Sequence, residues 1–592
     1  MTQLPSRLCP LPRTPPNTTY LGRALVRLGA RSNWELIIRC LITLAMALCA
    51  LAHADEEPQY GGSLNIATVN VTLSALSWDP ADWTWKSNHD AGAMREQLLV
   101  ADLDKSVRKG GKFPFRAEAF LPEEALRGEL AESWEWEDPL TLVVKLRRGV
   151  IFPSKPGVME ERELDAQDVV WSYNYVDQSP KQIPTYFDHI GSVVARDKHT
   201  VVFNFTEYNA EWSYRFGYGF HSAISPREMA NVDKKDWRLV TGSGPFLLGN
   251  YIHGNSHTYD KNPSYWDTER IGTDRYKIPF VDQVKYRIIK DEATWLTAIR
   301  TAKIDILEAV RWIAVDHLKE TTPELKWSRW LATGGNFLVM RVDQEPFDDI
   351  RVRRALNLAV NQKEITDLFY GGHAELMAYP QHPGFGEYFQ PLGEMPDSIK
   401  ELFEYKPEKA KELLAEAGFP DGFEFEVQVC SCSPNDMDLV PLLEGYFAKI
   451  GVTMIIRPME YASFLSLMTT RNHGPGYLMG SGHTTPITSI RKSFKTGQTW
   501  NPSQWSDPAF DEQVRILHLE RDKEKRVEMI RSMTLEMLDK APYVWLPTQY
   551  NYTAWWPWVK NYGGELRAGA VRPAPIYARI WIDQEMKKAM GF

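Results

Sequence analysis

Apolar positions with a period of two or of 3.6 residues divide the chain into predicted strands and helices. Leu142, Val144 and Leu146 alternate with Val143 and Lys145, which predicts a strand. This strand follows an acidic and aromatic segment and an Asp-Pro turn, and it runs into a basic turn that ends in glycine. By itself the pattern indicates a hairpin in an α/β protein.

Helical spacing dominates three later segments. An apolar stripe at Ile350, Ala355, Leu356 and Ala359 follows two aspartates that can cap a helix. Residues 407–418 begin with Pro and end with Gly, the usual order for the start and the end of a helix. A long helix with charged faces is predicted for about residues 513–538.

Strands and helices alternate between residues 423 and 479. The expected elements are a strand at 423–429, a helix at 439–450, a strand at 452–456, a helix at 461–469 and a short strand at 477–479. This alternation is typical of parallel βαβ units. With 592 residues the chain is too long for one core, so two or three structural units are expected.

The first 54 residues have the composition of a targeting segment. They carry six Arg and one acid, and an apolar run at 40–51 precedes Ala52-His53-Ala54, an A-x-A cleavage site. The run is too short to span a bilayer, so a cleaved signal peptide is expected rather than an anchor. Its removal would make the chain more acidic than its full-length net charge of −9. This balance argues against nucleic acid or an anionic membrane as the partner.

Cysteine is rare in the chain that would remain. Only Cys430 and Cys432 lie beyond the leader, which excludes a disulfide framework. At the end of a strand their side chains share one face. The preferred interpretation is that both cysteines are small buried residues. Metal binding and a local disulfide are the alternatives.

Several ordered motifs resemble the family 5 extracellular solute-binding proteins, the peptide/nickel-type receptors of ABC importers. The wording LAESWEW…LTLVVKLRRGVIFP, followed by LDAQDVVWSYN, resembles the signature region of that family. Further similar segments are TGSGPF with NPSYW, PFDDIRVRRALNLAV, PEKAKELLAEAG, WSDPAFD and APYVWLP. They are spread over nearly the whole chain beyond the leader.

The resemblance implies an α/β fold with two lobes, the periplasmic binding protein fold of type II, with an extra strand-rich subdomain in the first lobe. The expected first lobe is 55–335, with 100–225 as the subdomain. The second lobe is 336–547, and 548–592 return to the first lobe. Hinge closure around a small organic solute, first of all an oligopeptide or a peptide-like compound, would present it to a membrane permease.

The implied protein is a periplasmic monomer and not an enzyme. It needs no cofactor or metal and binds no nucleic acid. The sequence contains no Gly-x-x-x-x-Gly-Lys-Ser/Thr loop, so a separate ATPase is the expected partner. A receptor for an oligosaccharide or a metal chelate, with the same fold, is the alternative. A secreted hydrolase with an aromatic cleft is the alternative from another class, although no Gly-x-Ser-x-Gly or His-Glu-x-x-His motif is present.

One departure from the family affects the expected ligand. Peptide-binding members hold the ligand's α-amino group with an Asp in a W-x-A-D-Y pattern, but here an alignment on Pro486 places Gly482 at the Asp position and Met479 at the Trp position. The glycines could bring backbone N–H groups against a ligand instead. Indole rings and a guanidinium supply the other candidate contacts. The candidate ligand-binding residues are Trp83, Trp85, Tyr218, Trp312, Met479, Gly480, Ser481, Gly482, His483, Arg491, Trp500 and Trp505.

Overall fold

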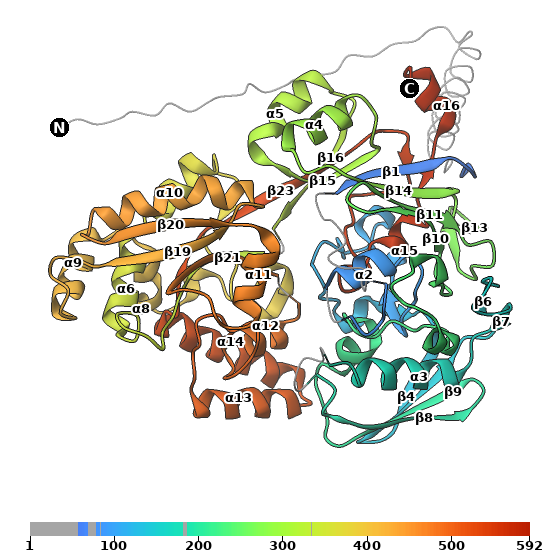
Figure 1. Cartoon of the computed structure of the whole chain (residues 1–592), viewed down its shortest axis with the longest axis horizontal. Helices are drawn as coiled ribbons and strands as arrows, with labels where there is room; N and C mark the ends of the chain where they lie inside the picture. The colour runs from blue at the N-terminus through green and yellow to red at the C-terminus, as the bar shows by residue number, and fades with distance from the viewer. Residues whose placement is uncertain (1–56, 69–77, 83–84, 181–185, 333, 483) are drawn as a thin grey trace, which may run out of the picture. The chain divides into compact units, whose positions relative to one another are not determined.

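The computed structural model describes residues 57–68, 78–82, 85–180, 186–332, 334–482 and 484–592, without the side chain of Ser481. The predicted leader therefore lies outside the described residues. Residues 58–270 and 275–592 form one compact unit. We call the elements around its larger sheet, within 58–332 and 548–592, the first lobe, and those of 334–547 the second lobe (Figure 1).

The first lobe is built on an eight-stranded sheet. Its order along the sheet is β10 (Phe246–Ile252), β11 (Ser256–Lys261), β14 (Gln283–Ile288), β1 (Ser63–Thr68), β15 (Ile306–Arg311), β23 (Thr548–Trp555) and β16 (Lys326–Leu331). The eighth strand, β18 (Ala374–Glu375), comes from the second-lobe segment and pairs with β23. β1 runs parallel to β14 and β15, and the remaining pairs are antiparallel. Two helices, α4 (Glu292–Arg300) and α5 (Trp312–Thr321), pack beside β15.

A four-stranded antiparallel sheet contains the predicted hairpin. Its order is β4 (Ala131–Asp138), β5 (Thr141–Leu146), β9 (Thr200–Phe205) and β8 (Ile190–Asp197), and helix α3 (Ala166–Asp177) packs on β8 and β9. Asp165 caps α3, and its side chain accepts a hydrogen bond from the Gln167 N–H. The period of two at 142–146 is therefore confirmed as a strand.

Short elements complete the first lobe. The two-stranded pairs are β2 (Leu99–Ala101) with β3 (Leu126–Gly128), β6 (Ile151–Phe152) with β7 (Arg162–Glu163), β12 (Thr268–Ile271) with β13 (Asp274–Lys277), and β24 (Val559–Lys560) with β25 (Trp581–Ile582). The helical turns are α2 (Trp85–Ala91), η1 (Leu103–Lys105), η2 (Val107–Lys109), η3 (Glu123–Ala125), the π-helical η4 (Ser213–Tyr218), η5 (Arg227–Asn231), η6 (Trp237–Leu239), α15 (Ala574–Tyr577) and α16 (Gln584–Ala589).

The second lobe has a five-stranded sheet with helices on both faces. Its order is β20 (Thr453–Met459), β19 (Glu424–Cys430), β21 (Gly476–Gly482), β17 (Gly334–Met340) and β22 (Tyr543–Trp545). β19 is parallel to β20 and β21, as the alternation of strands and helices predicted, whereas β17 is antiparallel to both of its neighbours. Alternate residues of β17 enter different cores: Leu338 packs with α6 and α10, and Phe337 packs with α12 and α14.

The helices of the second lobe follow the predicted order with one correction. They are α6 (Ile350–Ala359), α7 (Gln362–Glu364), the π-helical η7 (Ile365–Phe369), η8 (Pro383–Tyr388), η9 (Leu392–Glu394), α8 (Asp397–Lys400), η10 (Glu401–Phe403), α9 (Pro407–Glu416), α10 (Pro434–Ala448), α11 (Tyr461–Thr469), α12 (Pro486–Phe494), α13 (Pro508–Leu519) and α14 (Lys523–Lys540). The single helix predicted for 513–538 is wrong. Asp522 caps a new helix, because its carboxylate accepts hydrogen bonds from the N–H groups of Glu524 and Lys525.

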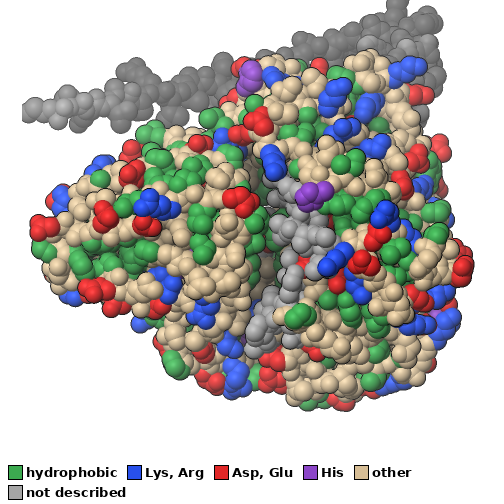
Figure 2. All heavy atoms as spheres, viewed as in Figure 1, with side chains coloured by type: hydrophobic (Ala, Val, Ile, Leu, Met, Phe, Trp, Pro, Cys, Tyr) green, Lys and Arg blue, Asp and Glu red, His purple; other side chains and the backbone are tan. Residues whose placement is uncertain are grey.

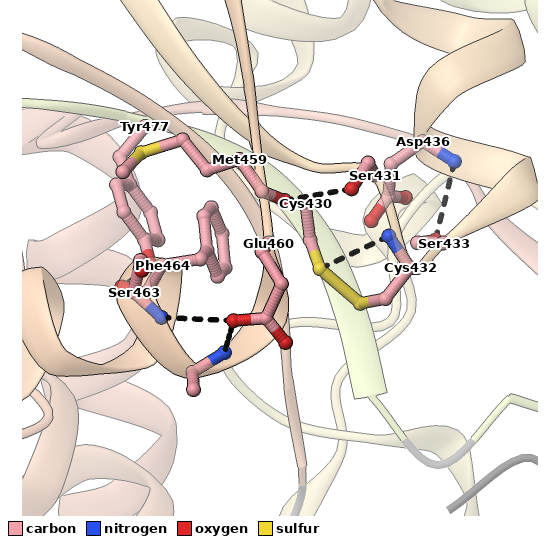
Figure 3. Close-up of a disulfide and its surroundings, with 11 residues drawn as sticks. Cys430, Ser431, Cys432, Ser433, Asp436, Met459, Glu460, Ser463, Phe464 and Tyr477 are labelled. Carbon is pink, nitrogen blue, oxygen red and sulfur yellow. Dashed lines mark hydrogen bonds between the residues drawn. A yellow bond between two sulfur atoms is a disulfide. The ribbon is translucent and has the colours of Figure 1, made fainter.

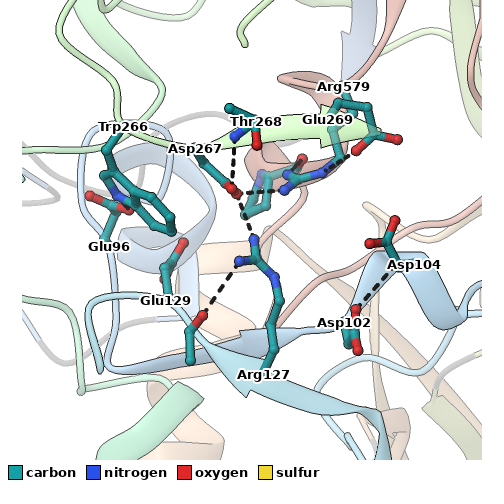
Figure 4. Close-up of polar contacts among 12 residues, drawn as sticks. Glu96, Asp102, Asp104, Arg127, Glu129, Trp266, Asp267, Thr268, Glu269 and Arg579 are labelled. Carbon is teal, nitrogen blue, oxygen red and sulfur yellow. Dashed lines mark hydrogen bonds and ion pairs between the residues drawn. The ribbon is translucent and has the colours of Figure 1, made fainter. Parts of the chain in front are cut away.

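Buried ion pairs hold the C-terminal segment against the first lobe (Figure 4). Arg127 and Arg579 both donate to Asp267 Oδ2 at 2.6 Å, and the Arg579 side chain also lies 2.8 Å from Glu269. Arg572 pairs through both terminal nitrogens with Glu129, at 2.5 and 2.9 Å, and both side chains are 1% exposed. Figure 2 shows acidic and basic side chains interspersed on the visible face. Within the described ranges, no helix has the length and apolarity needed to cross a bilayer.

The buried pair of Glu129 and Arg572 gives a stability prediction. Glu129→Gln removes the carboxylate that pairs with the buried Arg572 guanidinium, so the free energy of unfolding should fall by about 3–5 kcal/mol. The exposed pair of Glu137 and Arg196 supplies the control, because Glu137→Gln should change it by about 1 kcal/mol or less. Denaturant titration measures both variants. Equal effects of the two substitutions would contradict the assigned role of the buried pair.

Candidate functional site

A cavity of about 400 Å³ is lined by residues of both lobes. Its volume is in the range of small-molecule sites. The first lobe contributes Trp85, Glu118, Arg567 and Val571. The second lobe contributes Cys430, Cys432, Ser433, Asp436, Tyr461, Phe464, Leu465, Met468, Tyr477, Met479, Gly480, Gly482 and Trp500.

The second-lobe wall is apolar and is held in place by ring packing. Helix α11 presents Phe464, whose ring stacks on Tyr477 of β21 with centroids 4.0 Å apart. The Tyr477 hydroxyl donates a 2.6 Å hydrogen bond to the Phe464 carbonyl, which fixes the strand against the helix. Met479 continues this wall from the same face of β21. The wall therefore offers a preformed surface for apolar parts of a ligand.

Gly482 makes room for a carboxylate from the other lobe. A Cβ at Gly482 would lie 1.8 Å from Glu118 Oε2, so only glycine allows Glu118 its present position. Nearby, the Lys492 ammonium donates to the Gly482 carbonyl. A carboxylate of the first lobe therefore lies beside the position where peptide-binding members have their Asp.

Glu118 is the cavity's unpaired acid. Among the described residues no donor lies within hydrogen-bonding distance of its carboxylate, although the side chain lines the cavity. Burial raises the pKa of Glu118, and the charges of Lys492 and Arg567 offset part of that effect. Burial likewise lowers the pKa of Lys492 to about 8. A carboxylate desolvated without a partner is stabilised by any cation that enters the cavity.

Two further charged groups line the cavity. Arg567 lies 3.2 Å from Glu308, so its charge is already partly compensated. Asp436 lies in the first turn of α10, where burial raises its pKa and hydrogen bonds with Ser433 and Asn435 partly offset the effect. The cavity thus combines an apolar wall with one compensated cation and two acids.

Cys430 and Cys432 form a disulfide at the edge of the cavity (Figure 3). Cys430 is buried at the end of β19, whereas Cys432 is exposed. The preferred expectation of two small buried residues is therefore wrong, and the local disulfide is the alternative that holds. Their same-face placement at the end of a strand allowed the bond. In the described part of the chain, no group of three His, Cys, Asp or Glu could hold a metal ion.

The structure brings five of the candidate residues to this cavity: Trp85, Met479, Gly480, Gly482 and Trp500. Tyr218 lines a second cavity of about 510 Å³, which also lies between residues of both lobes. Its hydroxyl donates to the Leu121 carbonyl at 3.1 Å, and the side chain is 2% exposed. Trp83, His483 and the side chain of Ser481 lie outside the described residues.

Three other candidates line neither of these two cavities. Trp312 packs on Tyr370 with ring centroids 4.8 Å apart, beside the α6 core. Trp505 packs against the core formed with α12 to α14. Arg491 is buried and donates to Gln498 at 2.6 Å, and burial together with nearby Arg215 lowers its pKa to about 10. These side chains are used in packing and internal hydrogen bonding.

Sequence reasoning missed Glu118, Asp436 and Arg567. Each is one of many charged residues, and neither its spacing nor its immediate neighbours mark it as cavity-lining. The one indirect signal was the glycine at position 482, which was interpreted as room for backbone N–H groups against a ligand, whereas the structure places the carboxylate of Glu118 there.

Geometry and comparison agree on the class of this protein: a solute-binding protein with two lobes. Residues 125–499 match the family described as "Bacterial extracellular solute-binding proteins, family 5 Middle", which covers more than half of the 592 residues. The chain belongs to family 5 of the bacterial extracellular solute-binding proteins. This family consists of binding proteins, so the expectation that the protein is not an enzyme is confirmed.

Individual relatives are similar over most of their length. The chain is 24% identical to "Di/tripeptide-binding protein 1" of Pseudomonas aeruginosa over 79% of this chain and 86% of the relative. It is 25% identical to "Heme-binding protein A" of Haemophilus influenzae over 89% and 96%. The periplasmic binding protein DppA of Helicobacter pylori, solved with the peptide STSA, superposes with a TM-score of 0.72 at 21% identity, over 89% of this chain and 99% of that chain. The expected two-lobed α/β fold is thereby confirmed.

The disulfide can be tested by thiol labelling. Iodoacetamide should leave the peptide that contains Cys430 and Cys432 unlabelled in the folded, non-reduced protein, because both sulfurs are bonded to each other. After reduction the same peptide should carry two labels in a mass spectrum. Labelling at both positions without reduction would show that the two thiols are free.

Proposed function

We propose that the protein is the periplasmic receptor of an ABC importer, and that it captures a peptide-like solute with a cationic amino group by closure of its two lobes. The observation that carries this proposal is the unpaired carboxylate of Glu118 in a cavity lined by both lobes. The names of relatives such as "Di/tripeptide-binding protein 1" and the peptide-bound DppA of Helicobacter pylori support a peptide-like ligand.

A ligand ammonium would compensate the charge of Glu118. Burial disfavours the ionised carboxylate, and a charge-assisted hydrogen bond from an ammonium restores it. The remainder of a small peptide could then lie on the apolar wall formed by α11 and β21, where Phe464 and Tyr477 are already packed together. Arg567 lines the same cavity and could face a ligand carboxylate.

The position of Glu118 couples this contact to closure. Glu118 belongs to the first lobe and Gly482 belongs to the second. The Glu118 carboxylate occupies the space that a side chain at position 482 would fill. A ligand that pairs with Glu118 while it lies against β21 contacts both lobes at once. It therefore binds the closed form more tightly than the open form, which is the condition for ligand-driven closure.

The remaining features of the receptor are part of the same proposal. A cleaved leader over 1–54 would export the chain. The lobe boundaries at 55–335, 336–547 and 548–592 would put the strands β17 and β23 next to the two crossings. Energy for import would come from a separate ATPase that acts on a membrane permease.

A ligand screen tests the proposal. Thermal unfolding should shift with short peptides, and at a concentration of 100 times Kd the added stability should be about 2.7 kcal/mol. A shift with oligosaccharides or metal chelates but not with peptides would replace the peptide proposal. Turnover of a chromogenic substrate by the pure protein would contradict the binding role altogether.

The role of Glu118 is tested with the peptide found in that screen. Glu118→Gln should weaken binding about 10- to 100-fold, because it removes a charge-assisted hydrogen bond. N-acetylation of the peptide should weaken binding to the parent protein similarly and should add little in the variant. Isothermal titration calorimetry measures all four affinities, and Glu135→Gln, at an exposed acid of β4, is the control.

The same residue predicts a pH dependence of binding. The contact requires the ionised form of Glu118, and burial raises its pKa above the ordinary value of 4.5. As the pH falls, affinity should therefore decline at a higher pH than it would for an exposed glutamate, whereas Glu118→Gln should be insensitive in this range. Equal pH profiles of the parent and the variant would show that another group binds the amino end.

A further inference from the structure

A second acid, Glu211, crosses from one lobe to the other. It lies in the first lobe between β9 and η4, and its side chain is 4% exposed. Its carboxylate reaches the N-terminus of α12, which belongs to the second lobe and contributes Ile487, Ile490 and Phe494 to the core of that lobe. A first-lobe side chain thus completes a second-lobe helix.

Three donors of the second lobe converge on this carboxylate. The Thr488 N–H donates to Glu211 Oε1 at 3.0 Å, and the Thr488 hydroxyl lies 2.7 Å from the same oxygen. The Thr485 hydroxyl also donates to Oε1. The first N–H groups of a helix have no partner within the helix, and the helix dipole favours a negative charge there. Thr485 Oγ1 caps α12 by accepting from the Thr488 N–H at 3.0 Å, and Glu211 shares this N–H and adds the negative charge.

Nitrogen atoms of side chains from both lobes surround Glu211. Arg215, in its own lobe, donates to Oε2 at 2.9 Å, and His518 Nε2 of the second lobe lies 3.3 Å from the same oxygen. Burial alone would raise the pKa of Glu211, but Arg215, His518 and Arg491 hold it well below its usual range. In contrast to Glu118, this carboxylate is fully compensated without a ligand.

Neighbouring contacts join the same two segments. The Ala210 N–H donates to the His518 carbonyl at 2.8 Å, and Ala210 packs against the second-lobe core. Phe120 of the first lobe lies edge-on to Phe385 of the second, with centroids 5.0 Å apart. Separation of the lobes would expose all of these groups together. We call these contacts of Phe120, Ala210 and Glu211 with the second lobe the seam. The hydrogen bonds of Glu211 are its charged part.

We infer that Glu211 is a latch that closes the protein without ligand, because it binds the N-terminus of α12 across the two lobes. The latch supplies part of the free energy of closure, so the solute binds to a protein that is already partly closed. The apparent Kd of every ligand then depends on the fraction of closed protein. The inference rests on the lobe contacts alone and holds for any chemical class of ligand.

The test measures the closed fraction of the ligand-free protein by small-angle X-ray scattering. Glu211→Gln keeps the size of the side chain but removes the negative charge that faces Arg215 and the N-terminus of α12. Thr488→Val removes one donor from the opposite lobe. Each substitution should lower the ratio of closed to open protein about tenfold or more and enlarge the ligand-free radius of gyration. Saturating ligand should restore the compact scattering profile.

Two comparisons separate a latch from a general loss of stability. In the double variant the effects should be less than additive, because both substitutions break the same contact. Each single variant should raise the apparent Kd of strong and weak ligands by the same factor. Glu207→Gln, at an exposed acid of the same loop, should behave like the parent protein, and circular dichroism verifies that all variants are folded.

The inference fails if folded Glu211→Gln and Thr488→Val both scatter like the parent protein without ligand. It also fails if the parent is already as open as the variants. Loss of peptide binding through Glu118→Gln with unchanged closure would leave the latch intact, so the two proposals can fail independently.

Discussion

The crossing between the lobes is the constraint on which the rest of the structure depends. Asn336 of β17 donates to Gln549 Oε1 at 2.8 Å and to the Pro547 carbonyl at 3.3 Å, and its own carbonyl accepts from the Leu546 N–H. One buried amide therefore ties the segment that enters the second lobe to the segment that leaves it. Because both crossings are joined at one place, we expect any relative motion of the lobes to be a hinge bend about this point. The cavity and the contacts of Glu211 would then open and close together.

The two proposals assign different parts in closure to two glutamates of the first lobe. Glu211 is compensated by Thr485, Thr488 and Arg215, so its burial stabilises the closed form in the absence of solute. Glu118 has no hydrogen-bond donor among the described residues, and Lys492 and Arg567 offset only part of the effect of its burial, so we propose that a ligand cation supplies the rest. If both proposals hold, Glu211 favours closure without solute, and Glu118 makes closure depend on the charge of the ligand.

The local pattern of apolar residues predicted most helices and strands, because the residues within or next to β5 and α9 already show the period of a strand and the Pro and Gly boundaries of a helix. It failed where one residue interrupts a continuous pattern, as Asp522 does by capping α14. The candidate site was only partly predictable. Trp85 and Gly482 were identified from residue type and family motif, but Glu118 lies 364 positions before Gly482 and meets it only through the fold. Arg491 has the chemistry of a ligand contact, yet the fold buries it against Gln498.

Native mass spectrometry of the protein as purified tests the central claim most directly. The account predicts a bound species that dissociates into amino-acid fragments, and it predicts that this species is absent or greatly reduced in Glu118→Gln while Glu135→Gln retains it. A bound solute without a cationic group, retained equally by the parent protein and by Glu118→Gln, would contradict the account.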